Sequence, residues 1–389
     1  MRQLFICTIA LFFSICSSLK ANNGTSRNFY LITCEPGDEI YSLFGHSALR
    51  YQDESNRIDV VFNYGLFDFN APNFVWNFVL GKTDYLLGYT NYNTFINSYK
   101  REGREVYQDT LNLTNSEKVV LFNSIRDNLK PQNRLYRYNY LRNNCSTKLE
   151  DQITTACNGA ITWEKRGQSS LSFRALLDQY MDYNSWDAIG IYIALGAKCD
   201  QVATWNETMF LPEYLQAGIK NSQKKNQEKI TKGETKVLLK SNKLDNNKGW
   251  QAINNIYVLL FIVLLITIYR KRKKAIFNFV SRVLWLVNAI ASVILLFLGI
   301  VSVHPLTGYN MNLLVFSPLA FIPLITSWKK NSKHKITRYG LILYGVSVMV
   351  LLITTAIFSL QKIHIAVYCT ALIYTVIGIA QYNDLKKTT

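Results

Sequence analysis

The stretch HSALRYQDESNRIDVVFNY, residues 46–64, decides the fold of the first half of the chain. Ser47–Tyr51 and Ile58–Tyr64 are short and rich in β-branched and aromatic residues, which favours strands. The polar run Asp53–Asn56 between them is typical of a turn, because its side chains hydrogen-bond to nearby backbone. The sequence therefore predicts an antiparallel hairpin.

The hairpin also places the first candidate functional residues. If its centre lies between Glu54 and Ser55, His46 on the first strand is opposite Asn63 on the second, with Tyr64 beside it. Because side chains alternate between the two faces of a strand, this register decides which groups can reach the imidazole. We expect Asn63 to orient the ring of His46.

Strand and helix signals are mixed around the hairpin. Phe29–Cys34 has strand composition, and Ser116–Leu129 has helical spacing after the capping box of Thr114 and Glu117. Cys145–Cys157 is also helical by its spacing. We therefore expect an α+β domain. The residues expected on the buried face of the first helix are Val119, Val120, Phe122, Ile125 and Leu129.

The second half of the chain has a different composition from the first. The 389 residues carry a net charge of +17 with 49% hydrophobic residues, which excludes a disordered acidic chain and a collagen-like chain. Much of the positive charge lies next to apolar spans, so we expect a membrane and no nucleic acid as partner. Five apolar segments approach the roughly 17–25 residues of a membrane-spanning helix. They are Ile253–Tyr269, Val283–Val303, Leu313–Trp328, Tyr339–Leu360 and Ile365–Tyr382.

Basic residues predict the topology of these segments. Clusters at 270–274 and 329–338 alternate with gaps that hold little positive charge, and the positive-inside rule places the clusters in the cytoplasm. One arginine, an apolar run and small polar residues at the N-terminus are typical of a secretory signal. The predicted domains are a signal peptide (1–21), an exported domain (22–219), a basic polar linker (220–250) and a transmembrane domain (251–389). Pro318 and Pro323 should kink the third span.

One cysteine has the setting of a nucleophile. Cys145 begins a predicted helix after Asn144, a good N-cap, and the helix dipole lowers the pKa of a thiol there. Free N–H groups at this terminus, around Asn144 and Ser146, could also bind an oxyanion. With His46 nearby, this is a candidate Cys–His pair. The alternative is a disulfide, because Cys34, Cys157 and Cys199 would share the oxidising compartment. No cysteine or histidine spacing fits zinc, and we expect no metal and no cofactor.

Four motifs in the exported domain resemble one family. They are Thr33-Cys-Glu-Pro-Gly-Asp38, Phe44-Gly-His-Ser-Ala-Leu-Arg50, Asn63-Tyr-Gly-Leu-Phe-Asp-Phe69 and Tyr138-x-Tyr-x-x-Asn-Asn-Cys-Ser-Thr-Lys148. The chain closely resembles the Bacteroidota lipoprotein N-acyltransferase family (Lnb-type), from about residue 29 to 217 and again in the apolar spans. One departure is Lys148, where the pattern expects arginine with its planar fork.

The resemblance implies a fold and a reaction. His before Cys in the chain is similar to permuted NlpC/P60 and lecithin–retinol acyltransferase-like papain folds. In that group the cysteine attacks an acyl ester and holds the chain as a thioester, which implies this role for Cys145 with His46 as base. We expect a phospholipid as acyl donor and diacylglyceryl-modified lipoproteins as acceptors. The protein would be a multi-pass protein of the bacterial inner membrane, with its catalytic domain in the periplasm.

Further residues are candidates for substrate binding. Tyr64 lies beside the predicted catalytic strand. Arg50 could pair with a lipid phosphate, or be a solvated charge at a strand edge. His304, Asn310 and Asn312 lie in an outer gap between spans and could bind a headgroup or acceptor peptide, or simply cap the loop. Cys157 and Cys199 are a possible disulfide pair.

Two other functions use the same residues. A cell-wall amidase or endopeptidase of the NlpC/P60 kind would cut amide bonds with the same pair. Five spans exceed the needs of such an enzyme, and the sequence has no wall-binding repeat. A non-catalytic membrane adaptor would hold Cys145 in a disulfide, and thiol labelling separates it from the enzyme.

Overall fold

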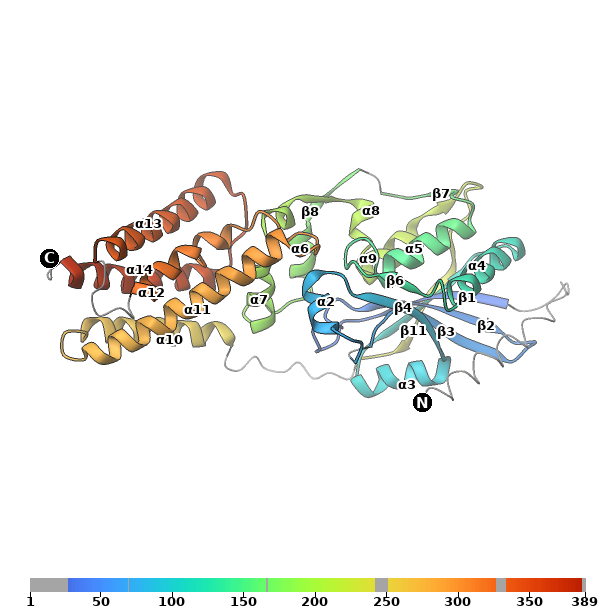
Figure 1. Cartoon of the computed structure of the whole chain (residues 1–389). Helices are drawn as coiled ribbons and strands as arrows, with labels where there is room; N and C mark the ends of the chain where they lie inside the picture. Colours follow the sequence, from blue (N-terminus) through green and yellow to red (C-terminus); the bar gives the residue numbers. More distant parts are fainter. Residues whose placement is uncertain (1–26, 69, 166, 242–250, 327–333, 387–389) are drawn as a thin grey trace.

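The structure is a computed structural model that describes residues 27–68, 70–165, 167–241, 251–326 and 334–386. The predicted signal peptide lies outside these residues. The chain forms two parts placed end to end, a β-sheet with its covering helices and a group of long helices (Figure 1). This division agrees with the change of composition along the sequence.

A seven-stranded sheet, with its paired strands antiparallel, organises the first part. Its order is β11-β5-β1-β2-β3-β4-β6. The predicted hairpin and the strand before it are confirmed as β2, β3 and β1. The bounds are β1 Arg27–Cys34, β2 His46–Asp53, β3 Ile58–Leu66, β4 Asp84–Asn91, β5 Val106–Leu111, β6 Leu135–Arg137 and β11 Thr231–Leu239.

The register of the hairpin differs from the prediction by two residues. Leu49 pairs with Phe62 and Asp53 pairs with Ile58, so Asn63 is not directly opposite His46. The shift has a local cause, because the turn takes up residues 54–57 and Arg57 has a left-handed backbone with φ of 54°. On its other side, His46 pairs with Cys34 of β1.

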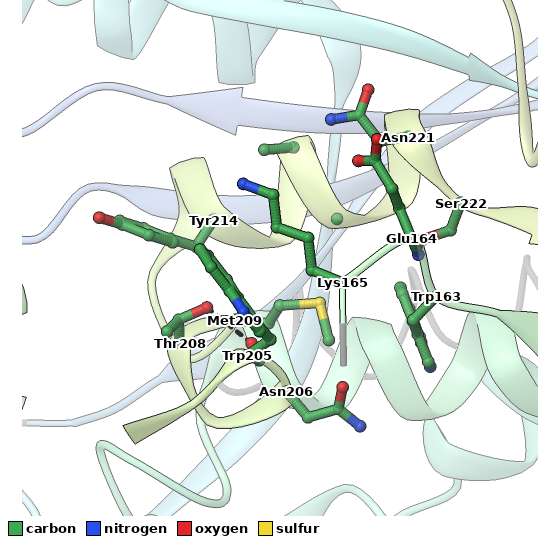
Figure 2. Close-up of a pocket in the computed structure, with 12 residues that line it drawn as sticks. Trp163, Glu164, Lys165, Trp205, Asn206, Thr208, Met209, Tyr214, Asn221 and Ser222 are labelled. Carbon is green, nitrogen blue, oxygen red and sulfur yellow. Dashed lines mark hydrogen bonds between the residues drawn. The ribbon is translucent and has the colours of Figure 1, made fainter. Parts of the chain in front are cut away.

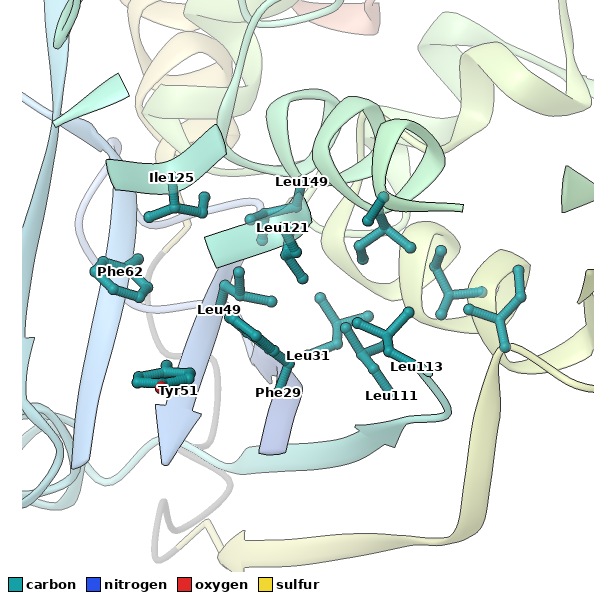
Figure 3. Close-up of a cluster of buried hydrophobic side chains, with 14 of the residues drawn as sticks. Phe29, Leu31, Leu49, Tyr51, Phe62, Leu111, Leu113, Leu121, Ile125 and Leu149 are labelled. Atoms are coloured by element: carbon teal, nitrogen blue, oxygen red, sulfur yellow. The ribbon is translucent and has the colours of Figure 1, made fainter. Parts of the chain in front are cut away.

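Helices cover both faces of the sheet (Figure 1). One face carries α4, α5 and α9, and its apolar side chains meet those of the strands in the main core (Figure 3). The other face carries α3, which packs on a smaller cluster. The bounds are α3 Tyr92–Glu102, α4 Asn115–Asn128, α5 Cys145–Ala156 and α9 Pro212–Asn221.

The predicted helix after Thr114 is confirmed, including its capping box with Glu117. Its predicted buried face is partly wrong, because α4 buries Leu121 and Ile125 and leaves Val119 and Val120 exposed. The prediction grouped adjacent residues, but a helix that lies on a flat sheet buries a narrower stripe than the one we chose.

The described part of the predicted 220–250 linker is mostly not a tether. Residues Thr231–Leu239 form β11, which pairs with β5 at the edge of the sheet. Lysines on an edge strand discourage pairing with other chains, so a lysine-rich composition suits this position. Residues 242–250 lie outside the described part of the chain.

Smaller elements complete the first part of the chain. They are α2 Phe74–Leu80, β7 Ile161–Thr162, β8 Gln168–Ser172, α6 Phe173–Asp178, α7 Trp186–Ala194, η1 Ala197–Asp200, β9 Val202–Thr204, α8 Trp205–Thr208 and β10 Gln223–Lys224. Figure 1 shows α2, α6 and α7 between the sheet and the long helices.

Among its described residues, the second part has five apolar segments, of which three are long enough to cross a membrane. These three are Lys274–Ile300, Lys335–Phe358 and Ile365–Lys386, and the shorter ones are Ala252–Ile268 and Met311–Thr326. The elements are α10 Ala252–Ile268, α11 Lys274–Ile300, η2 Met311–Leu314, η3 Pro318–Ala320, α12 Phe321–Thr326, α13 His334–Ile353, η4 Thr354–Phe358 and α14 Ile365–Lys386. The proline-containing segment is broken before Pro318, where Ser317 caps the next turn.

Candidate active site

Cys145 is the first residue of α5, as predicted, and its position is fixed by Asn144. The Asn144 side-chain oxygen accepts hydrogen bonds from the backbone N–H groups of Ser146 and Thr147, at 2.9 and 3.0 Å. Its amide nitrogen donates to the carbonyls of Tyr140 and Phe210, at 2.7 and 2.8 Å. One side chain therefore caps the helix and connects it to two loops.

His46 is the first residue of β2, and its side chain lines the same cavity as Cys145, close enough for each group to shift the pKa of the other. The strand can start here because Gly45 has φ of 78°, and a Cβ atom at this position would lie 2.6 Å from the carbonyl oxygen of Cys34. A second link holds the two elements together, since the hydroxyls of Ser47 and Ser146 are 2.9 Å apart.

The two groups shift each other's pKa in opposite directions. Burial raises the pKa of Cys145, but the charge and hydrogen bond of His46 outweigh it, with help from the Ser47 backbone and the Ser146 hydroxyl, so the pKa of Cys145 is lowered. Burial lowers the pKa of His46, but the Cys145 thiolate and then Asn63 outweigh it, so the pKa of His46 is raised. Both shifts favour a thiolate–imidazolium pair.

Asn63 contacts His46 despite the shifted register. Its side-chain oxygen lies 3.2 Å from Nε2 of His46, and its amide nitrogen donates to the carbonyl of Val61. Because the amide group is oriented by Val61, its oxygen faces the ring and Nε2 must donate the proton. The other ring nitrogen, Nδ1, is then the one available to Cys145.

A cavity of about 340 Å³ opens beside the pair. Its lining comes from both parts of the chain and includes His46, Tyr64, Phe78, Tyr140, Cys145 and His304. The sequence analysis missed Tyr140 as a lining residue, although it lies in the motif Tyr138–Lys148 that also contains Cys145. Its hydroxyl donates to the carbonyl of Pro305, at 2.9 Å, and so joins the first part of the chain to the loop after α11.

Tyr64 lines this cavity from the core side. The residue is buried, and its hydroxyl has no hydrogen-bond partner among the described residues. Gly65 follows with φ of 96°, next to the Cβ atom of Cys145. Tyr64 therefore borders the pair, as expected, with a free polar atom.

Arg50 is not at the cavity, and both of our readings of it are wrong. It is buried, with a bidentate ion pair to Asp59 at 2.8 and 2.7 Å and a further hydrogen bond to Gln108. Its guanidinium also lies 3.4 Å from the ring centre of Tyr92. Arg50 lies in the middle of the sheet because β5, β1 and β11 extend it beyond β2. Asp59 and Gln108 hold three of its five N–H donors there, away from the cavity.

The predicted oxyanion role of Ser146 is also not supported. Its backbone N–H is used by the Asn144 cap and its hydroxyl contacts Ser47. The N–H of Asn144 donates to the hydroxyl of Thr147. The N-cap that positions the helix therefore uses the donors that we assigned to an oxyanion.

The three outer-loop residues have structural partners. Asn310 donates to the carbonyls of Ile193 and Ala194, and Asn312 donates to the carbonyls of Tyr192 and Ile193, all in α7. Both are buried, and neither lines the cavity. His304 does line it, although its Nε2 is hydrogen-bonded to a backbone carbonyl of α2. For the two asparagines the loop-cap alternative is the correct one.

The described cysteines form no disulfide. Cys34, Cys145, Cys157, Cys199 and Cys369 are free. Cys157 and Cys199 lie in separate hydrophobic clusters, so the pairing we considered does not form. Among the described residues there is also no group of three or more His, Cys, Asp or Glu side chains that could hold a metal ion.

A second cavity of about 130 Å³ lies beside α8 and α9 (Figure 2). Trp163, Lys165 and Trp205 line it, with the Lys165 ammonium 4.2 Å from the ring centre of Trp205. None of its described lining residues is a histidine or a cysteine, so a Cys–His pair is found only at the first cavity among the two described here.

The structure places a thiol at a helix N-terminus beside an imidazole, in a domain that packs against long apolar helices. These features define a membrane protein with a Cys–His site. The chain belongs to the Lnb family. Residues 17–179 match its N-terminal periplasmic domain and residues 245–388 match its transmembrane domain. The N-terminal part is therefore periplasmic, and membership indicates an enzymatic role in lipoprotein maturation. No curated protein and no solved structure matches the chain.

Proposed function

We propose that this protein is a lipoprotein N-acyltransferase that uses Cys145 as its nucleophile. The observation that carries the proposal is the free thiol of Cys145 beside the imidazole of His46, in a cavity that residues 303–305 after α11 also line. A thiolate at this place can attack a lipid ester, whereas a disulfide-bonded adaptor would lack the thiol.

In the first step the Cys145 thiolate attacks the ester carbonyl of a phospholipid. A C–S bond forms, the ester C–O bond breaks, and the imidazolium of His46 gives its proton to the departing lysophospholipid oxygen. Asn63 holds the ring so that Nδ1 faces the sulfur. Because the other donors of the helix turn are used by the cap, we assign the oxyanion to the backbone N–H of Cys145.

In the second step the thioester meets the α-amine of a diacylglyceryl-modified lipoprotein. A C–N bond forms, the C–S bond breaks, and His46 takes the proton that the amine loses. The product is an amide, which is more stable than the thioester. Both substrates are confined to the same leaflet, and this confinement raises their effective concentration at the site.

We also propose a permuted papain-like fold and an inner-membrane location with all five apolar segments inserted. The first is supported by a base on a central strand that precedes a nucleophile on a helix packed against the sheet. The second is supported by the basic clusters at 270–274 and 329–338, which the positive-inside rule places in the cytoplasm.

Mass spectrometry of the intact protein tests the reaction. After incubation with phospholipid and no acceptor, the protein should gain the mass of one acyl group, and an added amine should release it. Cys145→Ser should abolish the gain, while Cys157→Ser, a buried thiol elsewhere in the same domain, should keep it. In cells, Cys145→Ala should remove N-acylated lipoproteins and leave muropeptides unchanged. Altered muropeptides with normal lipoproteins would instead identify a cell-wall hydrolase.

A further inference from the structure

The short helix α2 has an unusual surface for a water-soluble domain. Its sequence is FVWNFVL, residues 74–80, and none of its side chains is buried. Val75 is 73% exposed, Trp76 57% and Phe78 48%. A surface helix normally presents polar residues to water, and a contiguous exposed apolar patch marks an interaction site.

The long helices hold α2 in place by its C-terminal end. The last carbonyls of a helix have no partner within the helix. Here those of Phe78, Val79 and Leu80 accept hydrogen bonds from residues 302–304, the chain that leaves α11. The donors are Nε2 of His304 at 2.6 Å, the hydroxyl of Ser302 at 2.8 Å and the N–H of Val303 at 2.9 Å.

Contacts with α11 give the depth of α2. Residues 283–300 of α11 carry no charged side chain, and these 18 residues span about 27 Å, close to the thickness of the hydrocarbon core. The ring of Trp76 packs on Phe297, with centroids 5.4 Å apart, so α2 lies beside the last turns of this stretch. Ile300 next to it is 78% exposed, as expected of a residue that faces lipid.

The exposed patch continues into the active-site cavity. Phe78 of α2 and Val303 after α11 both line the cavity that contains Cys145. Ile40 and Tyr41 line it too and are 60% and 64% exposed. The cavity is therefore bordered by apolar side chains at the level where α11 ends.

We propose that α2 lies in the outer-leaflet surface of the membrane and forms the entrance through which a lipid acyl chain reaches Cys145. The insertion of α2 follows from its exposed patch and its attachment to α11, as for other interfacial helices. The passage of an acyl chain rests, in addition, on the proposed transferase function. Along this route a chain moves from lipid to the sulfur over apolar side chains.

The depth of α2 can be measured without any activity. The protein is placed in nanodiscs whose phospholipids carry bromine on the acyl chains near the headgroup, and the quenching of its tryptophan fluorescence is compared with that of Trp76→Phe. The substitution should remove a strongly quenched component. Trp205→Phe, at the second cavity, should not. Equal quenching of the wild-type protein and Trp76→Phe would overturn the insertion of α2.

The entrance is tested by a charge on the patch. Val75→Asp should lower acyl-thioester formation from bilayer phospholipid at least tenfold, while Cys145 keeps its rate of alkylation by water-soluble iodoacetamide. Val119→Asp is the matched control, because Val119 is 51% exposed on α4, away from the long helices. Equal rates for the two variants would overturn the entrance. A wild-type protein that forms no thioester would overturn the proposed function and leave the quenching result standing.

Discussion

Replacement of Asn63 by aspartate tests how His46 is held. The side-chain oxygen of Asn63 is 3.2 Å from Nε2 of His46. Two unit charges at this distance attract by about 5 kcal/mol at an effective dielectric constant of about 20. Asn63 is only 5% exposed, so desolvation of the new carboxylate offsets part of this attraction. The remainder should raise the pKa of His46 by about 1–3 units.

The assay is the rate of acyl-thioester formation as a function of pH. The thiolate of Cys145 appears as the pH rises through its lowered pKa, and the imidazolium that protonates the leaving group is lost as the pH rises through the raised pKa of His46. The profile should be bell-shaped. Asn63→Asp should shift the alkaline limb of the profile to higher pH by about 1–3 pH units and leave the acid limb in place.

Asn63→Ala should move the same limb in the opposite direction. The substitution removes a hydrogen bond of about 0.5–1.5 kcal/mol that raises the pKa of His46. The alkaline limb should therefore shift to lower pH by about one unit or less. Asn91→Asp adds the same charge at the N-cap of α3 and should leave the profile unchanged. An alkaline limb that stays fixed in both Asn63 variants would refute the contact that we describe.

Three further predictions concern the fold around the site. Arg50→Met should lower the free energy of unfolding by about 3 kcal/mol. This value is at the lower end for a broken buried ion pair because Asp59 is partly exposed. The KM for phospholipid should stay unchanged, and a raised KM would show that Arg50 belongs to the substrate site. Gly45→Ala forces a Cβ atom against the carbonyl of Cys34 and should cost about 1–3 kcal/mol, seen in thermal melting, together with the loss of thioester formation. Burial raises the pKa of Asp53, but its hydrogen bonds outweigh burial, so the pKa in the folded protein is lowered. The stability that Asp53 contributes is therefore present above about pH 3.9 and is lost as the pH falls through the lowered pKa of the folded state. Asp53→Asn should therefore flatten the acid limb of the stability profile, and an unchanged limb would contradict this assignment.

Local signals predicted the parts of the site that depend on few residues. The N-cap Asn144 fixed the start of α5, and the composition of residues 46–64 predicted the hairpin that carries His46. The two-residue shift of the hairpin register could not be predicted from the sequence, because it depends on the left-handed backbone of Arg57 in the turn.

Long-range partners account for the predictions that failed. Arg50 is buried because Gln108 and β5 arrive from a distant part of the chain, and no local pattern shows this. The lysine-rich stretch that forms β11 lacks the alternation of a half-buried strand, and it pairs only because β5 has a free edge. Asn310 and Asn312 belong to the packing of α7 against the outer loop, which a single sequence does not display.

The buried amides of Asn310 and Asn312 have a geometric consequence for the whole molecule. Together with Gln361, which donates to the carbonyl of Leu195, they clamp the sheet-bearing domain to the helices below it. To tilt or lift away from the bilayer, the domain would have to break these bonds where no water can replace them. These contacts therefore fix the height of the Cys145 sulfur relative to the long helices, and the same domain on a different anchor would lose that fixed height.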